Sequence, residues 1–92
     1  MVINYEHSGF KVTTLNKNTI AIRLEGKFGE VMNKNLRKEI MTALKDFKQD
    51  VVIDLTRVDD VDTSSAALLV ECIRVSEATN TSLKVVGINN KI

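Results

Sequence analysis

The first part of the chain alternates between apolar and polar side chains, a pattern typical of strands with one buried face. Between Gly9 and Leu15, Phe10, Val12 and Thr14 fall on one side, and Thr19–Leu24 alternates in the same way. Asn16-Lys17-Asn18 separates the two segments, and asparagine tolerates the left-handed backbone angles of tight turns. The pattern predicts an antiparallel hairpin.

From about Glu30 the apolar residues recur at every third or fourth position, which is the spacing of one helix face. This apolar stripe consists of Met32, Leu36, Ile40, Leu44 and Phe47. The opposite, mildly cationic face carries Asn33, Lys34, Arg37, Lys38, Lys45 and Lys48. We interpret the cationic face as a solvated helix surface.

The second half of the chain predicts a strand, a helix and a further strand. Val51–Ile53 is a short apolar run without alternation, as in a strand buried on both faces. Residues 57–61 are expected to be a connection. Asp62-Thr63-Ser64 offers N-cap residues for a helix that runs to about Thr79, and residues 82–87 predict the last strand.

The predicted order is therefore β-β-α-β-α-β. Two strand–helix–strand crossovers imply parallel strand pairs, so we expect an α/β domain with a mixed sheet and helices packed against it. The chain has 92 residues, no proline and no internal boundary, which indicates a single domain over residues 1–92. Residues 88–92 are too few to predict an element, so a C-terminal helix is expected to be short or missing.

The composition excludes several classes of function. With 13 basic and 12 acidic residues, the net charge of +1 gives no electrostatic reason to expect nucleic acid or an anionic membrane. One cysteine and one histidine exclude an internal disulfide and multi-cysteine metal sites, and no cofactor site is predicted. No apolar run approaches the roughly 18 residues of a membrane span, and no signal peptide is evident. These features predict a cytoplasmic protein without membrane insertion.

The densest chemical signal is Asp62-Thr63-Ser64-Ser65, followed by Ala66 and Ala67. A helix start has free backbone N–H groups and a partial positive charge, which would receive a phosphate on a nearby hydroxyl. Helix capping explains one polar residue but not three hydroxyls followed by small residues. The segment is a candidate modification and docking site, and simple capping stays open as the alternative.

The second helix carries two apolar stripes. We expect Ala66, Leu69, Val70 and Ile73 to face the sheet. The second stripe consists of Leu68, Cys72 and Val75. A second apolar stripe beside a hydroxyl-rich helix start favours a partner interface, and deeper burial of the helix is the alternative.

These residues resemble the STAS domain, a family that includes bacterial anti-sigma-factor antagonists and stressosome proteins. The family signature is a strand ending Asp-Leu/Ile-Ser/Thr, a short loop, then Asp-Ser/Thr-Ser/Thr-Gly and a helix. Residues 52–58 and 61–65 resemble that signature, and Leu24-Glu25-Gly26 and residues 85–88 resemble its flanking turns. Two positions depart from it, because Ser65 stands where antagonists usually have glycine and Gly29 where many members have aspartate.

The resemblance implies a bacterial, non-enzymatic regulator of signal transduction and transcription. It assigns Thr63 as the phosphoacceptor, with Ser64 as the alternative, and Asp62 as the acid that orients the hydroxyl or contacts the kinase. The expected partners are a serine/threonine kinase-type anti-sigma factor, which phosphorylation releases, and a phosphatase. The expected partner-binding residues are Asp62, Ser64, Ser65, Ala66, Ala67 and Leu68.

The sequence leaves one other function open and disfavours two more. STAS domains also act as constitutive interaction subunits, for example in lipid-transport ATPase complexes, without phosphorylation. A receiver-type phosphoacceptor is disfavoured because no acid pair follows the first predicted strand, and a serine hydrolase lacks both a base and the Gly-x-Ser-x-Gly motif. No catalytic residue is therefore predicted, and a homodimer is left open.

Overall fold

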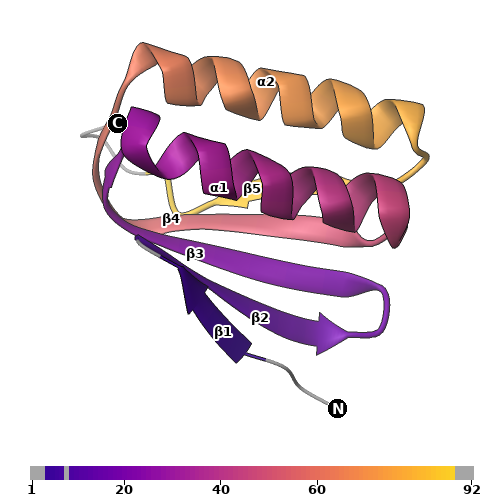
Figure 1. Ribbon diagram of the computed structural model, residues 1–92. Helices are drawn as coiled ribbons and strands as arrows, with labels where there is room; N and C mark the ends of the chain where they lie inside the picture. Colours follow the sequence, from indigo (N-terminus) through magenta and orange to yellow (C-terminus); the bar gives the residue numbers. More distant parts are fainter. Residues whose placement is uncertain (1–3, 8, 89–92) are drawn as a thin grey trace.

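A five-stranded mixed sheet carries two helices on one of its faces in the computed structural model, which describes residues 4–7 and 9–88 (Figure 1). The strands lie in chain order: β1 (Asn4–His7), β2 (Phe10–Asn16), β3 (Thr19–Phe28), β4 (Asp50–Val61) and β5 (Leu83–Val86). The pairs β1–β2 and β2–β3 are antiparallel, whereas β3–β4 and β4–β5 are parallel. The predicted mixed sheet is confirmed.

Each parallel pair is joined by a helical crossover. Helix α1 (Glu30–Met41) and the π-helical turn η1 (Thr42–Asp46) connect β3 to β4, and α2 (Thr63–Ala78) connects β4 to β5. Both helices lie side by side over the same face of the sheet (Figure 1). The predicted order β-β-α-β-α-β is therefore confirmed, and β1 adds an edge strand before it that the hydrophobic pattern did not predict.

The core lies between the sheet and the helices. It is built from alternate residues of β2, β3 and β4 and from the predicted stripe of α1. Phe47 is the exception in that stripe, because its side chain is 67% exposed. The wider π turn that ends at Asp46 adds a residue to the turn, so Phe47 leaves the face that packs on the sheet.

Two expectations about β4 were wrong. The strand is buried on one face only, because Val51, Ile53 and Leu55 are buried whereas Val52 and Asp54 are half-buried on the face without helices. Residues 57–61 are not a connection. They continue β4 and pair with the end of β3, as far as Val61 opposite Phe28, so β4 leads directly to Asp62.

The C-terminal helix that we expected to be short or missing falls on residues outside the described range, apart from Ile88. Among the described residues, no helix has both the length and the apolar character that crossing a membrane requires.

Candidate functional site

Asp62 lies where β4 ends and α2 begins, and it is the N-cap residue of α2. Its backbone N–H donates to the carbonyl oxygen of Phe28 at 3.1 Å, which ties the end of β4 to the end of β3. Its carboxylate Oδ1 accepts a hydrogen bond from the backbone N–H of Ser65 at 2.9 Å. The helix start predicted from the sequence is therefore capped by Asp62.

The same carboxylate also reaches the first turn of α1. The backbone N–H of Glu30 is one of the groups that lower the pKa of Asp62, and the N-cap residue of α1, Gly29, has no side chain to cap that helix. The pKa of Asp62 is lowered to about 2, first by the Ser64 hydroxyl and then by the backbone N–H of Ser65. Asp62 is therefore charged at neutral pH, caps α2 and lies beside the start of α1.

The three consecutive hydroxyls lie in three different environments. Thr63 is the first residue of α2, is exposed, and makes no side-chain hydrogen bond to the described part of the chain. The exposed Ser64 hydroxyl donates to Asp62 Oδ1 at 2.7 Å and accepts from Asn33 Nδ2 at 3.0 Å. Ser65 is fully buried, and its hydroxyl donates to the carbonyl oxygen of Phe28 at 2.7 Å. Of the three hydroxyls, that of Thr63 is therefore the one that is both exposed and without a hydrogen bond to the described residues. The Asp62 carboxylate accepts hydrogen bonds from Ser64 and Ser65, not from Thr63.

The side of α2 that faces the core is mainly the stripe that we did not expect to face the sheet. The helix buries Ser65, Leu68, Cys72 and Ser76 against the core. Of the stripe that was expected to face the sheet, only Leu69 packs against the core, whereas Ala66 is exposed and Val70 and Ile73 are 49% and 39% exposed. The bond from Ser65 to Phe28 sets this rotation, because residues one and two turns further along the same face must then also point inward.

The predicted partner-binding residues are therefore divided between surface and interior. Ala66 and Ala67 lie on the surface beside Thr63, whereas Ser65 is buried and Leu68 is only 7% exposed. The buried Cys72 has a pKa raised to about 11 by desolvation, so its thiol stays protonated. Within residues 4–7 and 9–88, no cluster of acidic, histidine and cysteine side chains could hold a metal ion.

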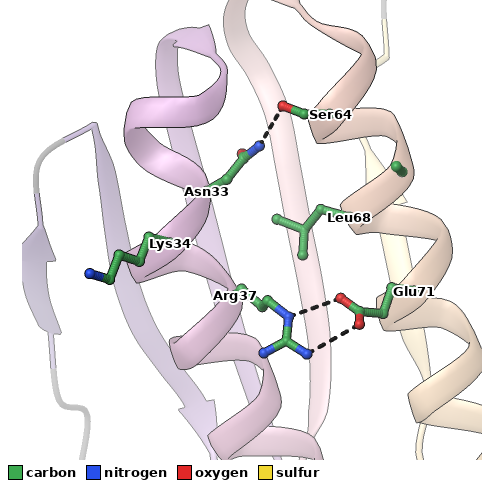
Figure 2. A pocket seen from close by; sticks show the side chains of 7 residues that line it. Asn33, Lys34, Arg37, Ser64, Leu68 and Glu71 are labelled. Atoms are coloured by element: carbon green, nitrogen blue, oxygen red, sulfur yellow. Dashed lines mark hydrogen bonds and ion pairs between the residues drawn. The ribbon is translucent and has the colours of Figure 1, made fainter.

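A groove of about 430 Å³ runs between α1 and α2, and Figure 2 shows the side chains that line it. Arg37 of α1 forms a two-pronged ion pair with Glu71 of α2, with Nε–Oε1 and Nη2–Oε2 distances of 2.9 and 3.1 Å. This pair raises the pKa of Arg37 and lowers the pKa of Glu71. The groove is lined by Asn33, Lys34, Arg37, Ser64, Ala67, Leu68 and Glu71.

Asn33 and Arg37 were expected on a solvated helix face, with no connection to the hydroxyl segment. Asn33 lies 31 residues before Ser64, and Arg37 lies 34 residues before Glu71. No short motif carries such pairings, since only the packing of α1 beside α2 brings the residues together.

The family model described as "Mlab, STAS domain" matches residues 12–92. The chain belongs to the STAS domain family. The resemblance drawn from residues 52–65 is thereby confirmed, whereas a search of curated proteins found no match.

Solved structures share the fold. The anti-sigma factor antagonist SpoIIAA in its unphosphorylated form is 20% identical, with a TM-score of 0.81 over 90% of this chain and 73% of that one. The phosphorylated form of SpoIIAA, described as a Bacillus cell fate determinant, is 21% identical, with a TM-score of 0.79 over 88% and 74% of the two chains. An antisigma-factor antagonist STAS domain from Rhodobacter sphaeroides is 17% identical, with a TM-score of 0.61 over 100% and 94%.

Proposed function

We propose that this STAS domain is a non-enzymatic regulator that binds a partner protein and is switched by phosphorylation of Thr63. The observation that carries the proposal is the state of the Thr63 hydroxyl. The hydroxyl is exposed and forms no hydrogen bond to the described residues. Thr63 is the first residue of the 16-residue helix α2 and directly follows the charged N-cap residue Asp62. SpoIIAA, whose fold is similar, has been solved in both unphosphorylated and phosphorylated forms, which supports a phosphoacceptor role for this domain.

The fold tolerates a phosphate at this position. A phosphate adds a charge of about −1.5 to −2, and the positive end of the α2 dipole attracts it. The permanent charge of Asp62 opposes it. Because Thr63 makes no side-chain bond to the described residues, its modification breaks none of the bonds that join α1 to α2. The phosphate therefore changes the surface and leaves the fold intact.

The surface next to Thr63 suits a protein partner. Ala66, Ala67, Val70 and Ile73 continue along α2 as an exposed face of small and apolar residues. A partner packed on this face would cover Thr63, and a phosphate there would place a doubly charged group in a desolvated interface. The partner class is a kinase-type anti-sigma factor that phosphorylation releases, and a phosphatase restores binding.

The test begins with peptide mass spectrometry on the protein isolated from its own cells. A phosphate on Thr63 is expected, and one on Ser64 would move the acceptor by one residue. Partner capture then compares Thr63→Ala, Thr63→Asp and the neutral Thr63→Asn. If Thr63→Asp no longer captures the partner while Thr63→Ala and Thr63→Asn still do, the result supports the phosphorylation switch. No phosphate under several growth conditions, together with equal capture by all three variants, would replace the switch with constitutive binding.

A further inference from the structure

The groove between α1 and α2 is bridged at two places. The Asn33–Ser64 hydrogen bond crosses it near the start of α2, and the Arg37–Glu71 ion pair crosses it two turns further along. Leu68 lies on α2 between these two bridges, and its side chain points toward α1 (Figure 2). The two bridges and Leu68 therefore define a slot with polar ends and an apolar floor.

The surface that the slot presents to a bound segment is mainly apolar. The polar side chains at its ends are bonded to one another, so the charges of Arg37 and Glu71 compensate within the pair. The floor that remains is Leu68 together with the exposed Ala67. A volume of about 430 Å³ lies within the range of sites that hold small ligands, and the lining suits one large apolar side chain.

The two helices that flank the slot differ in charge. On the outer face of α1, Lys34 and Lys38 are exposed and form no ion pair with other described residues. On the α2 side, Val70 lies next to Ala67 along the helix and is 49% exposed, whereas Ile73 lies on the side of α2 opposite to Glu71. A segment lying across the slot would thus meet Lys34 and Lys38 on the α1 side and Ala67 and Val70 on the α2 side.

We propose that the slot docks an acidic amphipathic segment of the partner protein. One apolar side chain of that segment packs on Leu68 between the two bridges, and its acidic residues face Lys34 and Lys38. The inference rests on the partner binding proposed above, and it does not depend on phosphorylation of Thr63.

The test uses a display library of random peptides selected against the whole chain. The selected peptides are expected to combine a large apolar residue with neighbouring Asp or Glu. Their binding, followed by fluorescence anisotropy, should weaken at least about tenfold with Ala67→Arg, which fills the mouth of the slot. The double variant Lys34→Glu/Lys38→Glu should weaken it several-fold, and added salt should weaken it as well. Lys84→Glu, an exposed charge reversal on β5, is the matched control and should bind like the wild type.

Peptides without acidic enrichment, or peptides whose binding survives Ala67→Arg, would overturn the inference. The experiments distinguish a failure of the slot proposal from a failure of the proposed phosphorylation switch. A phosphate on Thr63 without acidic binders removes only the slot, whereas acidic binders without any phosphate remove only the switch.

Discussion

Gly29 and Asp62 lie so close together that a Cβ atom on Gly29 would be 2.9 Å from Oδ2 of Asp62. The backbone N–H of the next residue, Glu30, is one of the groups that lower the pKa of the Asp62 carboxyl. The missing side chain is therefore what lets the acid that caps α2 also lie against the start of α1. Many family members have an aspartate at this position, and here such a residue would place two carboxylates in contact.

Substitution of Gly29 should destabilise the protein. We expect Gly29→Ala to lower the free energy of unfolding by about 1–3 kcal/mol, because the new methyl group displaces Asp62. Gly29→Asp should cost more, since like charges add to the crowding. Urea denaturation measures both variants. The double variant Gly29→Asp/Asp62→Asn should be less destabilised than the sum of its single changes, and strict additivity would contradict the proximity argument.

The charge of Asp62 should make its contribution to stability dependent on pH. Its pKa falls from the ordinary 3.8 to about 2 in the folded protein, mainly through the Ser64 hydroxyl. A group whose pKa is lowered by folding stabilises the protein fully above its unfolded-state pKa and loses that effect as the pH falls through the folded value. Wild type should therefore exceed Asp62→Asn in stability at pH 6, and the gap should close between about pH 4 and pH 2.

Urea midpoints of the two proteins across this pH range provide the measurement. Other acids whose pKa is lowered, such as Asp54 beside Thr56, are present in both proteins and cancel in the difference. A gap that stays constant from pH 6 to pH 2 would show that the Asp62 charge is not what stabilises the cap of α2.

Negative charge at the two neighbouring hydroxyls should have different effects. Thr63→Asp should change the free energy of unfolding by less than about 0.5 kcal/mol, because Thr63 is exposed and an acid is favourable in the first turn. Ser64→Asp should lower it by about 1–2 kcal/mol, since it removes the bonds to Asp62 and Asn33 and adds a like charge. Thermal denaturation ranks the variants, and Thr63→Asn and Ser64→Asn are the neutral controls. Equal melting temperatures for the two Asp variants would contradict the distinction.

The parts of this protein that the sequence predicts are those set by local pattern. The order of the elements follows from their periodicity, and the start of α2 follows from Asp62, a residue that caps its own helix. The rotation of α2 could not be predicted, because both apolar stripes have helical spacing and the choice depends on Ser65 bonding to Phe28, 37 residues away. The extension of β4 to Val61 likewise depends on pairing with β3.

The bond from Ser65 to Phe28 should contribute to stability beyond the burial of a hydroxyl. Ser65→Ala keeps nearly the same volume and removes the bond, so it should lower the free energy of unfolding by about 1 kcal/mol. The cost stays near this value because the Phe28 carbonyl still accepts from the backbone N–H of Asp62. Ser65→Gly should cost about 1 kcal/mol more, since glycine is a poorer helix former than alanine.

The matched control is Ser76→Ala, which removes a buried hydroxyl that bonds only within α2, to Ile73 at 2.6 Å. Urea denaturation should show a clearly smaller loss for Ser76→Ala, and equal losses would mean that the link between α2 and β3 adds nothing.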